Sequence, residues 1–415
     1  MKELSRLGYS NECAKQIFLI FFKISFNVCF RKPPKYKVLI ISKFHVDFSN
    51  IKILLYNTFM FLDSLILKQF RVFKEQQYTV GSPVVGIYGP NTAGKTSILE
   101  AIYILSRGKS SRSRVDSDVI KKGYEFASAQ LKFRNKEDEK ELYFVVQSAE
   151  NTRSAKVFKI NGVTKSIRNF TGTLACVLFS PDDIRLILGS PSRRRDYLDT
   201  IFFQFDKEYK KDLGVYTRSL KQCNAVLQLI LENRATKSDL DVWVESLVVS
   251  GKKITEKRIN FFKDIDSFIA KTSHELSDGW EMKIDYIPNR IDKDRIERNY
   301  HYILNSGHIL GGPHRDDYDF KIKLNGDDRY ESLADFGSRG QQRIGALIFK
   351  LSELEYIADA IKSRPILLLD DVFSELDEVR REKVLNYSKN QQTIITTTDK
   401  KNLENIDGIQ LISLK

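Results

Sequence analysis

The sequence has few of the residues that build metal clusters or disulfide scaffolds. Its 415 residues include four cysteines and five histidines. The cysteines, Cys13, Cys29, Cys176 and Cys223, are too far apart for a zinc or disulfide spacing, which favours a reducing compartment. The histidines form no ligand cluster along the chain either. These absences argue against a zinc protein and against a disulfide-stapled secreted domain.

Long apolar runs are also missing. The segment Ile17–Phe22 is apolar but too short to cross a bilayer, and Lys23 ends this apolar run. No small-residue cleavage site is evident near it, so the sequence predicts no signal peptide. We therefore expect a cytoplasmic protein with no membrane partner.

The net charge is +13, which favours a polyanionic partner. The charge is uneven, because residues 1–59 contain ten Lys/Arg against three Asp/Glu. The remaining excess is modest and serves solubility as often as nucleic-acid binding. Charge alone therefore does not identify a partner.

Residues 1–59 show no sustained periodicity and are rich in Phe, Ile, Lys and Asn. A strand-like pattern begins only at Met60, one of three methionines. We expect residues 1–59 to be an N-terminal extension outside the working protein, translated from an upstream start. The alternative is a genuine arm or membrane-surface segment.

The clearest motif follows the apolar run Val84–Tyr88 and precedes a helix-like segment, Ser97–Leu105. It reads G-x-x-x-x-G-K-[ST] and consists of Gly89, Pro90, Asn91, Thr92, Ala93, Gly94, Lys95 and Thr96. A strand, a glycine-rich turn and a helix N-terminus in this order surround a phosphate with N–H groups, so we expect these residues and Ser97 to bind ATP.

Two residues of this motif have expected roles of their own. Lys95 would reach the β- and γ-phosphates, and the Thr96 hydroxyl would bind Mg²⁺. The alternative is a glycine turn that binds nothing. Thr92 stands where many such loops have glycine, and a positive φ there would strain a β-branched residue.

A second candidate stretch is the apolar run Pro365–Leu369, which ends in Asp370 and Asp371. A buried strand beside the phosphate loop would point Asp370 at Mg²⁺, and Asp371 would orient or deprotonate the attacking water as the catalytic carboxylate. The alternative is a strand that ends in a solvated turn.

A third stretch contains Ser338, Gly340 and Gln341 and precedes a strongly helical segment, 344–361. A hydroxyl, a glycine and an amide at a helix N-terminus form an anion site. The alternative is an ordinary helix cap, a role that Ser338 also suits.

The periodicity predicts an α/β protein with an inserted helical part. We expect a first α/β part at 60–188, a helical part at 189–300 and a second α/β part at 301–415. Within the helical part, apolar residues recur at helical spacing in four segments, 197–213, 216–233, 240–262 and 268–276. The pair Asn161-Gly162 predicts a hairpin turn.

These stretches, in this order from Met60 onward, resemble the RecF family of DNA repair ATPases, which have ABC/SMC-type heads. The resemblance also covers three stretches that are highly specific to this family, Leu178–Asp183, Gly189–Arg195 and Gly312–Asp317. In addition, Ser338–Gln341 resembles the ABC signature and Ser374–Asp377 resembles the D-loop. The resemblance implies an ABC/SMC-type P-loop ATPase head of two lobes with a compact helical insertion.

The resemblance also implies how the protein works. Ser338 and Gly340 would cap the γ-phosphate of ATP held by a second subunit, so that ATP closes a homodimer and slow hydrolysis reopens it. Family members bind double-stranded and gapped DNA, with the RecR and RecO proteins as partners. In this chain Thr396–Asp399 occupies the place of the transporter switch histidine, and Cys223-Asn224 stands where Arg-Asn is expected.

Contacts with DNA have the least support from individual residues. Lys109, Arg112, Arg193 and Arg194 are basic and lie near predicted loops, where they would meet backbone phosphates. The alternative is that they are solvated or paired within the chain.

Three other functions are compatible with an ATPase motif. An ATP-hydrolysing transporter subunit would need a membrane partner and usually the switch histidine. A nuclease would need an additional metal cluster, and a structural clamp would bind without hydrolysis. The resemblance to the RecF family favours instead an ATP-dependent DNA-binding protein of recombinational repair and replication restart.

Overall fold

A computed structural model describes residues 59–113, 115–135, 138–148, 155–374, 376–404 and 406–415. These residues belong to one compact unit. The expected N-terminal extension, apart from Phe59, lies outside the described residues.

The first layer is a six-stranded antiparallel sheet. Its strands, in spatial order, are β2 (Phe73–Thr79), β1 (Phe61–Phe70), β4 (Phe126–Arg134), β5 (Glu139–Gln147), β6 (Ala155–Ile160) and β7 (Val163–Lys165). The expected hairpin at Asn161-Gly162 is confirmed, because both residues have positive φ and join β6 to β7.

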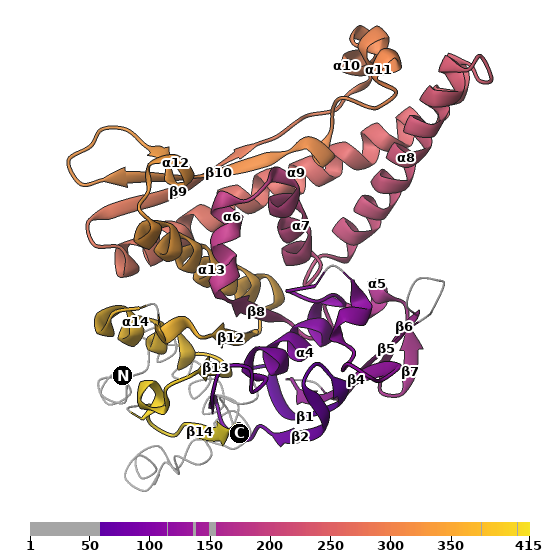
Figure 1. Ribbon diagram of the computed structural model, residues 1–415. Helices are drawn as coiled ribbons and strands as arrows, with labels where there is room; N and C mark the ends of the chain where they lie inside the picture. The colour runs from indigo at the N-terminus through magenta and orange to yellow at the C-terminus, as the bar shows by residue number, and fades with distance from the viewer. Residues whose placement is uncertain (1–58, 114, 136–137, 149–154, 375, 405) are drawn as a thin grey trace, which may run out of the picture. The chain divides into compact units, whose positions relative to one another are not determined.

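The second layer is a five-stranded parallel sheet that carries the phosphate loop. Its strands, in spatial order, are β14 (Gln410–Ser413), β3 (Val84–Tyr88), β13 (Thr393–Thr397), β12 (Ile366–Asp370) and β8 (Cys176–Phe179). Helix α4 (Lys95–Arg107) is buried and packs against both sheets (Figure 1). Helix α4, which follows the phosphate loop, is thus held between two hydrophobic layers.

The helical part consists of α7 (Pro191–Phe202), α8 (Lys207–Leu231) and α9 (Lys237–Leu276). Helices α8 and α9 pack along each other (Figure 1). Four shorter helices were expected in this part, and the expected positions of the breaks between them are wrong. Gly214 lies inside α8, and α9 runs unbroken for 40 residues because its buried stripe continues through Phe261, Ile265 and Ile269.

The helical part leads back through a three-stranded antiparallel sheet. Strand β9 (Trp280–Ile287) pairs with β10 (Asp317–Leu324), which also pairs with β11 (Glu331–Ser332). This pairing joins residues on both sides of the boundary expected at 300. Helix α13 (Arg339–Ile361) then packs against α9 and β8, so it connects the helical part to the parallel sheet.

The remaining elements are short. They are η1 (Asp116–Val119), α5 (Ile167–Phe170), η2 (Pro181–Ile184), α6 (Arg185–Leu188), α10 (Lys293–Arg298), α11 (Tyr300–Ser306), η3 (Pro313–Arg315), α12 (Leu333–Phe336), η4 (Val372–Ser374), α14 (Glu378–Ser388) and η5 (Lys400–Leu403). Among the described residues, none of the helices has the length and apolarity needed to cross a membrane.

Candidate functional site

The phosphate loop lies between the end of β3 and the start of α4. A side chain at Gly89 would come within 2.5 Å of the Leu414 carbonyl oxygen, and one at Gly94 would come equally close to the Phe73 ring. Gly94 also has a φ of 100°, which favours glycine. Helix α4 begins with no side-chain cap, so its first N–H groups form an anion site.

Thr92 has a φ of 73°, so the strained conformation considered from the sequence is present. Its side chain is exposed, and the hydroxyl donates a hydrogen bond to the Asn91 carbonyl. Pro90 and Asn91 are exposed as well, whereas Ala93 is half-buried. The tip of the loop therefore faces solvent, while both of its glycines are buried.

Lys95 lies across the loop. Its Nζ donates hydrogen bonds of 2.8 Å to the carbonyl oxygens of Gly89 and Pro90. Burial lowers the pKa of Lys95, and the nearby charges of Asp371 and Asp370 oppose this shift. A cation held by neutral carbonyls has strong attraction left for phosphate.

Thr96 and Asp370 are brought together at the base of the loop, although they are far apart in sequence. The Thr96 hydroxyl donates to Asp370 Oδ1 over 2.9 Å, and the Thr396 hydroxyl donates to the same oxygen over 2.7 Å. Burial raises the pKa of Asp370. A hydroxyl and a carboxylate are hard oxygen ligands, so this pair fits Mg²⁺.

Asp371 follows in an uncommon conformation. Its φ is 50°, and its N–H donates to both the carbonyl and the hydroxyl oxygen of Thr396, each over 3.1 Å. Its Oδ1 is buried and has no hydrogen-bond partner among the described residues. A buried acceptor without a partner costs about 1–3 kcal/mol, which water or a ligand group would recover.

Arg112 lies near the carboxylates, which the sequence did not indicate. Its charge counters the raised pKa of Asp370. The segment that carries it is tied to α4, since Ser110 donates to Glu100 and Arg71 makes two bonds to the same buried carboxylate, at 2.7 and 2.8 Å. Arg112 itself is exposed, so its charge acts on Asp370 from the protein surface.

The signature segment caps α13. Ser338 Oγ accepts from the Gln341 N–H over 3.2 Å, and Gln341 Oε1 accepts from the Ser338 N–H over 2.8 Å. The helix cap considered from the sequence is therefore present. Ser338 and Gly340 are exposed, and Phe336, just before them, is 69% exposed. The start of α13 thus presents a hydroxyl, N–H groups and an aromatic ring to solvent.

The comparisons with known proteins agree with this geometry. A family model described as the RecF/RecN/SMC N-terminal domain matches residues 61–414. The DNA replication and repair protein RecF of Acetivibrio thermocellus is 36% identical over 361 residues, covering 83% of this chain and 95% of the relative. RecF of Lactobacillus gasseri is likewise 36% identical, over 82% and 93%. The chain belongs to the RecF family.

Solved structures show the same fold. A structure of the recombination mediator protein RecF with ATP, described in the RecFOR pathway, superposes with a TM-score of 0.78 at 32% identity, over 86% of this chain and 96% of that one. The head domain of Smc from Pyrococcus furiosus superposes with a TM-score of 0.52 at 20% identity. The ABC/SMC-type head expected from the sequence is confirmed.

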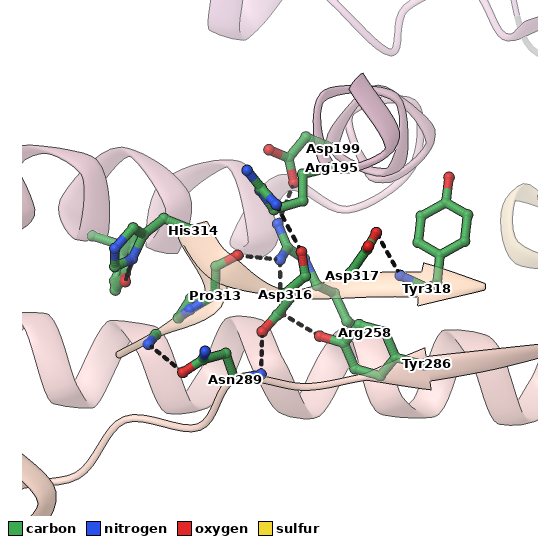
Figure 2. Close-up of polar contacts among 12 residues, drawn as sticks. Arg195, Asp199, Arg258, Tyr286, Asn289, Pro313, His314, Asp316, Asp317 and Tyr318 are labelled. Carbon is green, nitrogen blue, oxygen red and sulfur yellow. Dashed lines mark hydrogen bonds and ion pairs between the residues drawn. The ribbon is translucent and has the colours of Figure 1, made fainter. Parts of the chain in front are cut away.

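The family-specific stretches outside the nucleotide site meet in a buried network (Figure 2). Arg258 of α9 donates to Asp316 and to the Pro313 carbonyl over 2.8 and 2.7 Å. It also donates to Asp199 over 2.8 Å and to the Tyr209 hydroxyl over 2.9 Å. Its side chain is 2% exposed, so the network joins α7, α8, α9 and η3 inside the protein.

Asp316 is the most connected carboxylate of this network. It accepts from the Tyr286 hydroxyl and, over 2.6 Å, from the Asn289 N–H, as Figure 2 shows. Its carbonyl oxygen accepts from Arg195 over 2.8 Å. The family-specific stretches Gly189–Arg195 and Gly312–Asp317 are therefore bonded to each other, which the sequence did not reveal.

The four residues expected to contact DNA fall into two groups. Lys109, Arg112 and Arg193 are exposed. Arg194 instead makes a two-pronged contact with Asp317, at 2.7 and 2.8 Å, and donates to the Gly189 carbonyl. Arg194 is thus engaged within the protein, which is the alternative considered for these residues.

Proposed function

We propose that this protein is an ATP-dependent DNA-binding protein of recombinational repair and replication restart, whose slow ATP hydrolysis acts as a conformational switch. The observation that carries the proposal is the 2.9 Å contact between Thr96 and Asp370, at the foot of an uncapped helix N-terminus. This arrangement offers N–H groups to phosphates and two oxygen ligands to a cation. Its location in a RecF-family head favours ATP with Mg²⁺.

The residues of the site have distinct roles in this proposal. The loop from Gly89 to Ser97 binds the phosphates, and Lys95 turns from its two carbonyls to the β- and γ-phosphates. Thr96 and Asp370 hold Mg²⁺, which supplies electrostatic stabilisation of the phosphate oxygens. Asp371 accepts a hydrogen bond from the attacking water through Oδ1, which has no partner among the described residues.

The signature segment acts on a second copy of the chain. Ser338 and Gly340 are exposed, so they are available to the γ-phosphate of ATP in the loop of a partner. ATP then lies between two heads, and its binding favours the closed dimer because only that state makes both sets of contacts. Hydrolysis removes the γ-phosphate and reopens the pair.

DNA and protein partners follow from the family. We infer binding to double-stranded and gapped DNA, with RecR and RecO as partners in the same pathway. Lys109 and Arg193 are exposed and suited to backbone phosphates, and such contacts weaken steeply as salt rises. The proposal assigns no DNA contact to Arg194.

Ultracentrifugation of wild type and Ser338→Arg, with and without ATP, tests the dimer. Wild type is expected to dimerise with ATP, whereas Ser338→Arg stays monomeric and keeps its nucleotide affinity. Val242→Arg, at a 71%-exposed position on α9, is the control for an added arginine and is expected to dimerise. Loss of nucleotide affinity in Ser338→Arg would show that the serine serves its own site instead.

Turnover measurements separate the proposal from its alternatives. ATP hydrolysis with and without gapped duplex DNA is expected to be slow and stimulated by the DNA. Asp371→Asn is expected to bind ATP, to hydrolyse it far more slowly and to prolong the dimer. Binding without any hydrolysis in the wild type would leave a structural clamp as the better description.

A further inference from the structure

Thr396 occupies the position between the phosphate loop and the two carboxylates. It lies in β13, whose neighbours in the sheet are β3, which leads into the loop, and β12, which ends in Asp370. In the pairing register, Thr396 faces Ile87 on one side and Asp370 on the other. Its side chain is completely buried, so its hydroxyl must find partners inside the protein.

The partners of this hydroxyl determine the direction of its single proton. The oxygen lies 2.7 Å from Asp370 Oδ1, which can only accept from it, and 3.4 Å from the Leu369 carbonyl. The shorter contact is to the carboxylate, so the proton points to Asp370. A lone pair then accepts the Asp371 N–H over 3.1 Å. One hydroxyl thereby holds two consecutive residues.

Each of these contacts has a consequence for the site. The bond to Asp370 occupies Oδ1, which Thr96 also contacts, and so leaves Oδ2 with its acceptor capacity for a cation. The bond to Asp371 supports a backbone with a φ of 50°, a conformation that costs a non-glycine residue about 1–3 kcal/mol. This backbone keeps Asp371 Oδ1 buried and without a protein partner among the described residues.

We propose that Thr396 is a positioning residue for ATP hydrolysis. Its hydroxyl fixes the Asp370 carboxylate and the Asp371 backbone together, so that the metal-binding and water-binding carboxylates keep one relative geometry. This inference rests on the proposed ATPase function and assigns Thr396 no contact with nucleotide.

The substitution Thr396→Val tests the proposal because it keeps the side-chain shape. Folding is expected to persist, since the Asp371 N–H retains the Thr396 carbonyl and Asp370 retains Thr96. Turnover of saturating ATP is expected to fall about ten- to a hundredfold, the range for a lost hydrogen bond to a charged group. ATP affinity is expected to stay within about twofold, because the loop is untouched.

Three comparison variants separate positioning from packing. Thr396→Ser keeps the hydroxyl and is expected to restore most of the turnover. Thr393→Val, at a buried position of the same strand whose hydroxyl makes only 3.4 and 3.5 Å contacts to carbonyls, is expected to behave like wild type. In an Asp371→Asn background, Thr396→Val is expected to cause a smaller loss than in the wild type, because part of its effect passes through Asp371.

A measurement on the nucleotide-free protein gives an independent readout. Hydrogen exchange at the Asp371 amide is expected to be at least about threefold faster in Thr396→Val than in wild type, and unchanged in Thr393→Val. If the wild type hydrolyses no ATP, the proposed function is overturned. The exchange rate at Asp371 still tests whether the Thr396 hydroxyl holds the Asp371 backbone.

Several results would overturn the inference while leaving the ATPase function intact. Thr396→Val with the turnover of Thr393→Val would do so, as would Thr396→Ser with the defect of Thr396→Val, which would indicate packing. A full additional loss in the Asp371→Asn background, or an unchanged exchange rate at Asp371, would show that Thr396 does not act through this residue.

Discussion

Buried polar side chains at the end of β12 and around Arg258 differ in how fully their atoms are paired with other protein groups. At Arg258, a guanidinium meets two carboxylates, a tyrosine hydroxyl and a carbonyl, and the carboxylate of Asp316 has further donors. At the end of β12, Asp371 Oδ1 has no partner among the described residues. Lys95, close by, donates its hydrogen bonds to neutral carbonyls.

The backbone differs in the same way. Thr92 and Asp371, both in the nucleotide site, have φ values of 73° and 50°, whereas Asp316 has an extended backbone. Within the nucleotide site, two residues therefore have a strained backbone, and one of them, Asp371, also has a buried acceptor without a partner among the described residues. The difference teaches that a buried cluster of charged residues can be structural, because each charge of the Arg258 cluster has partners within the protein.

The largest expected effect comes from breaking the satisfied cluster. Arg258→Met leaves the buried Asp316 and the half-buried Asp199 without their cation, so the free energy of unfolding is expected to fall by about 3–5 kcal/mol in urea titrations. Arg185→Ala, which removes an exposed pair with Asp182, is the control and is expected to change stability by less than about 0.5 kcal/mol. Equal effects of the two variants would show that the buried cluster contributes no more to stability than an exposed ion pair.

An intermediate effect is expected from acid at His314, beside the same cluster. Burial lowers the pKa of His314 to about 4 from an ordinary 6.5, with Arg315 and Arg195 acting in the same direction and Asp316 against them. Its Nδ1 is 2.6 Å from the Tyr216 hydroxyl. Below pH 6.5, His314 is protonated in the unfolded chain but stays neutral in the folded protein until the pH approaches 4. The free energy of unfolding therefore falls as the pH drops towards 4.

The measurement is urea unfolding at about pH 7.5 and about pH 5. His314 is expected to account for a loss of about 2 kcal/mol between them, from about 1.4 kcal/mol per pH unit below its ordinary pKa. His314→Gln lacks the titrating group and is expected to lose correspondingly less on acidification. The same loss in the variant and the wild type would assign the acid sensitivity to other groups.

The smallest effect is expected in the strained phosphate loop. Thr92→Gly relieves the positive φ but makes the unfolded chain more flexible, so a net stabilisation of about 0.5–1 kcal/mol is expected. Thr92→Ala keeps a β-carbon and is expected to gain less. The nucleotide-free proteins are compared by thermal unfolding, and a lower midpoint for Thr92→Gly would show that Thr92 is not strained.

The sequence predicted those features that depend on near neighbours. The phosphate loop and the Asn161-Gly162 turn are contiguous motifs, and the strand that ends in Asp370 is a single apolar run. The breaks expected near Gly214 and between 262 and 268 were wrong, because packing along α8 and α9 outweighs local composition. The expected division of the chain at 300 separates β9 from β10, which pair.

Features that depend on distant partners were not predictable. Arg258 and Asp316 are 58 positions apart, and no local pattern links them. The same holds for Thr396, whose strand reads as an ordinary β-branched run but lies between β3 and β12. Arg112 was assigned to DNA because its charge was visible, whereas its proximity to Asp370 depends on how the segment folds against α4.

The order of strands in the parallel sheet has a consequence for protein synthesis. Strand β3 is among the first elements to leave the ribosome, yet both of its neighbours, β13 and β14, come from residues 393–413. Until these emerge, a strand of Val, Ile and Tyr has two unpaired edges, which invites association with other chains. Strand β3, which leads into the phosphate loop, therefore completes its pairing in the sheet only after residues 393–413 have been made.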